Sequence, residues 1–111
     1  MFSRPYRLSA QAAKLVARRG NGLSGPFLRI KWGLSRNPVS RATVVAGLAF
    51  DKRAIRRNLI KRRVREVLRP ILPKLRPAVN LMVFVNKAAT GCTFQELGAE
   101  LISLLKRARI I

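Results

Sequence analysis

Apolar residues recur at two spacings along this chain, three to four residues apart in some segments and every second residue in others. The wider spacing predicts amphipathic helices, whereas alternation predicts strands with two distinct faces. Residues 9–19 fit a helix with Ser9 as its N-cap and the Gly20-Asn21-Gly22 run at its end. The residues expected to face inward from this helix are Leu8, Ala12, Leu15 and Val16.

Three later segments are predicted to be strands. In residues 27–34, Leu28, Ile30, Trp32 and Leu34 alternate with Phe27, Arg29 and Lys31, which gives the strand a basic face. Residues 43–50 and 79–85 are apolar on both faces, as in an inner strand. Asn37-Pro38 marks the segment 35–41 as a loop.

Two further helices are predicted, over residues 52–69 and after Thr93. Pro70, Pro73 and Pro77 break the chain behind the first of them. Thr93 and Glu96 have the spacing of a capping box that starts the second. The apolar face of the closing helix is expected to comprise Leu97, Leu101, Leu104, Leu105 and Ala108. The order α-β-β-α-β-α predicts one α+β domain over residues 1–111, a small mixed sheet with packed helices.

The segment 52–69 has an apolar face beside a cationic one. Ile60, Val64, Val67, Leu68 and Ile71 can be buried together. The neighbouring face carries Asn58, Lys61, Arg62, Arg65 and Arg69. Like charges three and four residues apart repel one another. We therefore expect an anionic partner to lie along this helix.

The composition points to the same class of partner. The chain has 24 Lys and Arg against 4 Asp and Glu, a net charge of +20, and its 49% hydrophobic content is sufficient for a folded core. A nucleic acid is the first candidate polyanion and an anionic membrane surface the second. The Arg- and Ala-rich N-terminus also suits a transit peptide. Apolar runs such as 81–85 are too short to span a membrane, so we expect no transmembrane segment. Of the two candidate polyanions we expect the nucleic acid, with no membrane partner and no small-molecule substrate.

The residues offer little chemistry of their own. There is no histidine, and Cys92, the single cysteine, fits an apolar filler. We expect Asp51 to neutralise Lys52 and Arg53, and Glu66 to pair with Arg62 or Arg63. Glu96 and Glu100 are expected to be solvated and to support the helix cap rather than bind metal. Any catalysis is therefore expected to come from another molecule.

The basic segment RRNLIKRRVRE, residues 56–66, resembles the signature of the bacterial ribonuclease P protein subunit. The residues that match it are Arg57, Asn58, Lys61, Arg62, Arg65 and Glu66. Weaker likeness extends over most of the chain, including Arg7-Leu8, Gly20, Phe27, Gly47-Leu48, Lys52-Arg53, 86–89 and 93–96.

The resemblance implies an accessory subunit of a ribonucleoprotein endonuclease. In this family a large RNA, the ribonuclease P RNA, removes the 5′ leader of precursor tRNA with Mg²⁺ bound mainly by the RNA and substrate. The expected RNA-binding residues are Lys52, Arg53, Arg57, Asn58, Lys61, Arg62, Arg65 and Arg69. Phe27, Arg29 and Lys31 are candidates for a leader cleft beside the sheet. The family also implies a fold like the second domain of ribosomal protein S5, with a left-handed βαβ crossover. It further implies a cytoplasmic location, in a bacterium, or one in an organelle descended from a bacterium.

The chain departs from the family pattern at three places. Leu59 stands where a second Arg usually follows the Arg-Asn pair, and Ala13 and Ala17 stand where aromatic residues often contact the leader. The loop before the basic helix is about three residues shorter than usual, which is expected to shift the start of the helix. Phe27 is either a substitute stacking platform or a core residue.

Three other functions fit the composition less well. A small basic ribosomal protein bound to ribosomal RNA shares the size and charge, but does not explain the signature. A membrane-surface protein is disfavoured by the strands, and an independent nuclease by the scarcity of carboxylates.

Overall fold

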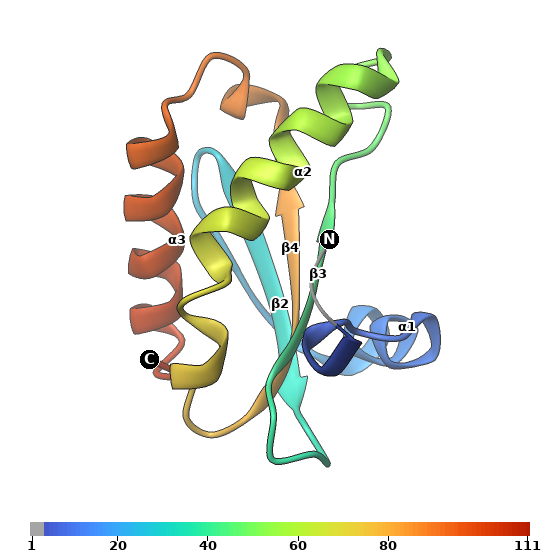
Figure 1. The fold of residues 1–111 in the computed structure, drawn as a ribbon, viewed down its shortest axis with the longest axis vertical. Coiled ribbons are helices and arrows are strands. Elements are labelled where there is room, and N and C mark those ends of the chain that lie inside the picture. The colour runs from blue at the N-terminus through green and yellow to red at the C-terminus, as the bar shows by residue number, and fades with distance from the viewer. Residues whose placement is uncertain (1–3) are drawn as a thin grey trace.

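The structure is a computed structural model and describes residues 4–111. Three helices and four strands alternate with short 3₁₀ turns along the chain (Figure 1). In chain order the elements are η1 (Arg4–Tyr6), α1 (Ala10–Arg19), β1 (Asn21–Ser24), β2 (Leu28–Leu34), β3 (Arg41–Val45), α2 (Ala54–Leu68), η2 (Leu72–Lys74), β4 (Val79–Val85), η3 (Lys87–Ala89) and α3 (Phe94–Arg107). The predicted α+β class is confirmed.

The four strands form one mixed sheet in the order β1-β2-β4-β3. β1 pairs antiparallel with β2, and β2 antiparallel with β4, whereas β3 and β4 are parallel. β4 lies inside the sheet with a partner on each side, and its two ends coincide with the predicted strand 79–85. A strand paired on both edges needs apolar residues on both faces, which is why its sequence identified it clearly.

The connection β3-α2-β4 is the parallel crossover of the fold. In Figure 1 both strands run upward, α2 lies in front of the sheet, and β4 is to the left of β3. The crossover is therefore left-handed, as the family resemblance implies. About 98% of such connections are right-handed, and the pattern of residues does not distinguish the two hands, so only the family resemblance predicted the left-handed one.

Helices cover both faces of the sheet. α2 and α3 pack on one face, where they enclose the main hydrophobic core, and α1 packs on the other (Figure 1). The main core includes Leu28 and Ile30 of β2, Val64 of α2 and Leu101 of α3, all completely buried. The smaller core beneath α1 is built from Leu8, Val16 and Met82. The sheet face around α1 therefore has much less apolar cover than the opposite face.

Several strands and buried positions differ from those predicted from the sequence. β1 was missed because its four residues contain only one apolar side chain, Leu23. The second predicted strand begins earlier and ends at Val45, since residues 46–50 form a turn rather than a strand. It was expected to lie inside the sheet but is an edge strand, which pairs with β4 alone among the described strands. Leu15 was expected to face inward but is 54% exposed, because α1 contacts the sheet through a narrower stripe.

Polar side chains cap the first turns of α1 and α3, as the sequence predicted. Ser9 Oγ accepts a hydrogen bond from Ala12 N at 3.2 Å, and Thr93 and Glu96 form the complete capping box. A buried polar contact was not predicted: Val79 N donates to Ser40 Oγ at 2.9 Å, with both residues buried. This bond joins the start of β4 to the residue before β3.

The expectation that Glu100 is solvated was wrong. Its Oε2 accepts hydrogen bonds from Phe27 N at 2.8 Å and Leu28 N at 2.6 Å. From the other side, Asn86 Nδ2 donates to Gly25 O at 3.2 Å. Glu100 on α3 thus holds the start of β2, a contact between residues more than seventy positions apart that no local pattern reveals.

Candidate nucleic-acid interface

Helix α2 buries one side and exposes its cations on the other. Ile60, Val64, Val67 and Leu68 are buried against the sheet and α3, as predicted from their spacing. The helix has no acidic residue in its first turn and no side-chain N-cap bond. Its positive N-terminal dipole end is therefore not neutralised by the residues of its first turn.

The segment before α2 is held by Asp51. Arg53 N donates to Asp51 Oδ1 at 2.8 Å, and the Arg53 guanidinium pairs with the same carboxylate at 3.2 Å. The backbone hydrogen bond from Arg53, followed by its side-chain bond, lowers the pKa of Asp51. Arg56 adds a weaker contact, 3.9 Å from Asp51 Oδ2. The structure thus pairs Asp51 with Arg53, as expected, and with Arg56, whereas no bond to Lys52 is present among the described residues.

Arg57 and Arg53, two of the predicted RNA-binding residues, have partners within the chain. Arg57 Nη1 donates to Asp51 O at 3.1 Å and to Lys52 O at 2.8 Å. Arg57 therefore ties the first turn of α2 to the segment before it. Arg53 is itself the N-cap and α2 begins at the next residue, so no further residue separates the segment held by Asp51 from the helix.

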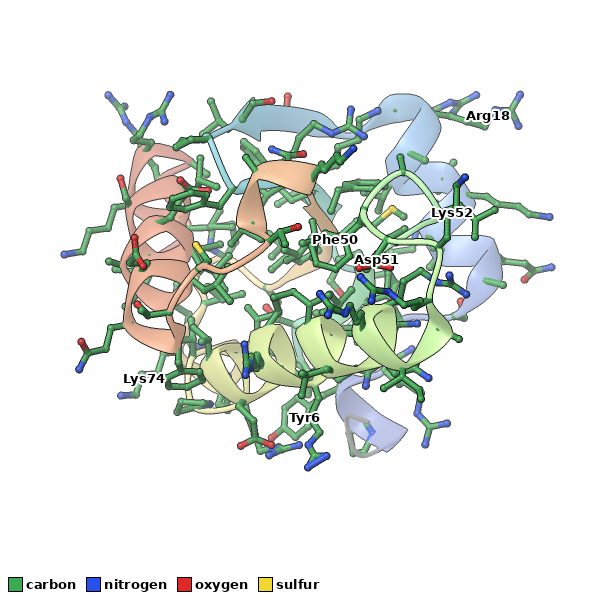
Figure 2. All side chains as sticks on the ribbon, turned by 90° about the horizontal axis from the view of Figure 1, so that it is seen from above. Tyr6, Arg18, Phe50, Asp51, Lys52 and Lys74 are labelled. Carbon is green, nitrogen blue, oxygen red and sulfur yellow. The ribbon has the colours of Figure 1, made fainter. Side chains whose placement is uncertain are left out.

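The cationic face of α2, which we call the exposed stripe, comprises Asn58, Lys61, Arg62, Arg65 and Arg69. The side chains in its central part have no partners of this kind. Within residues 4–111, no hydrogen bond or ion pair is present for the side chains of Asn58, Lys61, Arg62 and Arg65. Asn58 and Arg62 are exposed, and Lys61 and Arg65 are half-buried. Three cations and an amide thus present unused donors along two turns of helix. Lys52, also exposed, lies on the loop that leads to this helix (Figure 2).

Arg69 closes the stripe at the far end of α2. Its Nη1 lies 2.7 Å from Glu66 Oε1, with both side chains about half exposed. The expectation that Glu66 pairs with Arg62 or Arg63 was therefore wrong. An exposed pair of this kind contributes little to stability, about 0–1 kcal/mol, so Arg69 can exchange its carboxylate for another anion at small cost.

A second basic surface lies on the α1 side of the sheet. The Arg29 guanidinium sits 4.4 Å from the centroid of the Phe84 ring, a cation–π contact between adjacent strands. Lys31 Nζ donates to Ala17 O at 2.8 Å, at the end of α1. The structure therefore places Arg29 and Lys31 on one face, as the alternation predicted.

Phe27 is not part of that face. It precedes β2 and packs against the main core on the opposite side of the sheet. The aromatic residue on the basic face is Phe84, which the sequence reading missed. The signal was present in the alternation of β4, where Asn80, Met82 and Phe84 occupy every second position.

A hollow of about 360 Å³ lies on the flank of α2 nearest η3, and we call it the flank hollow. Phe50 and Ile60 form part of its lining, with Ile55 and Leu59 projecting from α2. Arg56 and Arg63 complete its helical side. Figure 2 shows Phe50 and Asp51 in this region, between η3 and the start of α2. None of these residues belongs to the predicted RNA-binding set.

Metal chemistry has no fitting ligand set in the described chain. No group of three or more His, Cys, Asp or Glu residues in positions 4–111 is placed to hold a metal ion. Asp51, Glu66, Glu96 and Glu100 each bond to a nearby arginine or backbone amide instead. Burial raises the pKa of the Cys92 thiol, with Glu96 and Glu100 adding to the shift, which fits its place in the core. The residues that the structure describes therefore do not fit a Mg²⁺ site.

No helix in the described part of the chain is both long and apolar enough to cross a membrane.

Comparison with known proteins agrees with this picture. The family profile described as Ribonuclease P matches residues 2–109. The ribonuclease P protein component of Cyanothece sp. is 39% identical, over 100% of this chain and 98% of that protein. That of Xylella fastidiosa is 36% identical, over 96% of this chain and 78% of its own length.

Solved structures show the same fold. The ribonuclease P protein from Thermotoga maritima superposes with a TM-score of 0.81 at 25% identity, covering 91% of this chain and 96% of that one. A Staphylococcus aureus ribonuclease P protein mutant gives a TM-score of 0.85 at 20% identity, with 96% and 90% covered.

The small α+β fold, the left-handed crossover and the cationic helix together indicate the class of basic RNA-binding proteins. This chain belongs to the ribonuclease P protein family. It is an accessory subunit of that tRNA-processing endoribonuclease, with ribonuclease P RNA and precursor tRNA as its partners. The ribosomal-protein alternative is not favoured.

Proposed function

We propose that α2 binds the ribonuclease P RNA through its exposed stripe, with Asn58, Lys61, Arg62 and Arg65 as the principal contacts. The observation that carries this assignment is the set of unused donors on that stripe. Repulsion between its cations is relieved when phosphates lie between them. Lys52, Arg53 and Arg69 extend the contact at either end of the helix.

In this proposal Arg57 both positions the start of α2 and contacts the RNA. Its guanidinium already bonds to the carbonyls of Asp51 and Lys52. A guanidinium carries five N–H donors, so Arg57 retains some for a phosphate while it positions the start of α2. Asn58, which has both donors and an acceptor and no partner among the described residues, is suited to contact a base edge.

The second part of the proposal concerns the precursor tRNA. Arg29, Lys31 and Phe84 face the α1 side of the sheet, where they offer cations beside an aromatic ring. This combination suits a single-stranded leader, because bases stack on aromatic rings while cations hold the phosphates. Phe84 thus takes the place proposed from the sequence for Phe27, and it supplies the aromatic group that Ala13 and Ala17 lack.

Catalysis in this proposal belongs to the RNA. The carboxylates of this chain are engaged in structural bonds, so Mg²⁺ is expected to be held by the RNA subunit and the substrate. The protein contributes binding and orientation, and acts as one RNA-binding domain over residues 1–111. As a member of this family it is expected to work in the cytoplasm.

The test is cleavage of a 5′-extended precursor tRNA by the cognate ribonuclease P RNA at low Mg²⁺, with and without the protein. We expect the protein to stimulate cleavage at the mature 5′ end and to be inactive alone. RNA binding without stimulation would contradict the accessory-subunit mechanism and leave α2 as a general RNA anchor.

The residue assignment is tested by changing Arg62 and Arg65 together to Ala. Neither side chain has an intramolecular partner among the described residues, so the fold should be retained. Each lost phosphate contact is expected to weaken binding about 5- to 10-fold, in line with charge-assisted bonds of roughly 1–1.5 kcal/mol. The control is Lys106→Ala with Arg107→Ala, which removes the same charge from exposed positions on α3. Equal loss in both double variants would assign the effect to net charge.

A further inference from the structure

The flank hollow lies on a part of α2 that the RNA-binding stripe does not use. Successive residues of a helix are about 100° apart around its axis. Leu59, Arg63 and Arg56 therefore lie roughly 100° to 160° around from Asn58, on the side that faces η3. The hollow is next to the stripe but distinct from it.

Its walls are apolar and unusually accessible. Ile55 is 83% exposed and Leu59 44% exposed, although both belong to a helix with a well-formed buried face. Phe50, only 8% exposed, lines the hollow below them. Exposed apolar residues that line a concavity, rather than being scattered singly, mark a binding surface.

Its rim is cationic. The Arg63 side chain has no hydrogen bond or ion pair within residues 4–111, and the Arg56 side chain has only the 3.9 Å contact to Asp51. A neighbouring hollow of about 430 Å³ shares Phe50, Asp51 and Arg56 with the first and adds Lys52 and Lys87 to the border. Asp51 is the one acidic residue lining either hollow, and it is already paired with Arg53.

Apolar walls with a cationic rim match the two parts of a nucleotide. A base is flat and largely apolar on its faces, whereas the phosphates on either side of it are anions. An apolar or acidic protein segment fits less well, because it would satisfy only one of these two features. The volume, about 360 Å³, is at the lower end of the range for small-molecule sites, which suits one base rather than an extended ligand.

We propose that the flank hollow binds one unpaired nucleotide of the ribonuclease P RNA, with its base against Leu59 and Ile55 and its flanking phosphates on Arg56 and Arg63. This inference rests on the proposed binding of that RNA along α2. The hollow lies along α2, with Phe50 and residues 89–91 completing it, whereas Arg29 and Phe84 lie on the opposite face of the sheet. A strand held on the stripe therefore reaches the hollow directly, and the leader does not.

Replacing Leu59 with Lys separates base binding from phosphate binding. Lysine adds a positive charge, which strengthens binding to RNA wherever a phosphate is the ligand. In a site that buries a base, however, the strongly hydrated ammonium replaces an apolar wall and weakens binding. The two chemistries thus predict changes of opposite sign for one substitution.

The experiment measures the Kd for the full-length cognate ribonuclease P RNA at fixed salt, with Ile102→Lys as the control. Ile102 is an exposed apolar residue of α3 outside the hollow, and its substitution adds the same charge. We expect Leu59→Lys to raise Kd about fivefold and Ile102→Lys to leave it unchanged or lower it slightly. A Kd for Leu59→Lys that is unchanged or lowered would overturn the proposal. Thermal unfolding of both variants verifies that each remains folded.

A second measurement distinguishes this inference from the proposed function. Arg62→Ala with Arg65→Ala tests the stripe in the same assay. If that double variant binds normally, the proposed function fails at the stripe. If it binds poorly while Leu59→Lys binds normally, the assignment of the stripe holds and that of the nucleotide site is wrong.

A cleavage assay tests whether the nucleotide belongs to the RNA subunit or to the leader. The ratio of cleavage rates for precursor tRNAs with long and short leaders should be the same for Leu59→Lys as for the unmodified protein, because the leader lies elsewhere. A changed ratio would overturn the assignment of the nucleotide to the RNA subunit.

Discussion

Replacing Glu100 with Ala is expected to destabilise the fold by about 2–3 kcal/mol, although the residue is a charged side chain on a helix surface. Its Oε2 accepts from Phe27 N at 2.8 Å and from Leu28 N at 2.6 Å. Truncation leaves both donors without their acceptor, at a cost of about 1–3 kcal/mol for each buried group. Both bonds are partly buried, so water restores some of this loss and the expected cost stays near the lower end of the combined range.

Glu100→Gln should cost less, about 1 kcal/mol. The amide oxygen can still accept both hydrogen bonds, but as a neutral acceptor it makes weaker ones. The segment at Gly25 leaves little room for adjustment, since a Cβ there would lie 2.7 Å from Glu100 Cδ. Urea unfolding, followed by circular dichroism and by the fluorescence of Trp32 in β2, gives the free energies of unfolding.

Gln95→Ala is the matched control, because Gln95 is exposed on the same helix and its side chain makes no hydrogen bond within the described residues. Its effect should stay within about 0.5 kcal/mol. If Glu100→Ala is no more destabilising than this control, the two short hydrogen bonds contribute nothing measurable, and the argument that Glu100 anchors β2 is refuted. An unchanged slope against urea concentration would show that the denatured state is unaffected.

Three further predictions concern stability and binding. Ser40→Ala should cost about 1–3 kcal/mol because Val79 N loses its buried acceptor, whereas Ser103→Ala on the exposed face of α3 should be nearly neutral in the same urea titration. The affinity for ribonuclease P RNA should fall with salt on a log–log slope between about −3.5 and −7, from five to eight phosphate contacts; a slope equivalent to fewer than two contacts would contradict electrostatic docking. The lowered pKa of Asp51 contributes stability that is present above the ordinary carboxyl pKa and is lost as the pH falls through the lowered value. Thermal unfolding between about pH 5 and pH 2 should therefore show a smaller decrease for Asp51→Asn than for the unmodified protein.

Much of the fold was readable from local patterns. Helix caps are local, since Ser9 and Thr93 bond to amides three residues away. β4 was located to the residue because an inner strand must be apolar on both faces. The burial of Ile60 and Val64 followed from their spacing, since a helix fixes which side chains share a face.

The family and its partners were implied by the resemblance of residues 56–66 to the ribonuclease P protein signature, whereas register and charge alone predicted only an anionic partner. The spacing of the residues predicts which side chains share a face, and the positive charge of that face predicts an anionic partner. The departures from the family pattern were visible at the same stage. The structural role of Leu59 could not be predicted from the sequence, because η3 and Phe50, which complete the hollow around it, come from other parts of the chain.

Contacts between distant segments were decided by tertiary structure alone. The acceptor for Phe27 N is a carboxylate on α3, and the aromatic partner of Arg29 is Phe84 on a neighbouring strand. The left-handed crossover was likewise beyond any local pattern, since the same α2 fits either hand. The sequence by itself determined which faces are apolar, which are cationic and what class of molecule binds them. Only the packing of the strands and helices decided the partners of Arg29 and Lys31, because Phe84 and Ala17 O belong to other elements of the chain. The paired cations of α2, by contrast, find their partners within six residues.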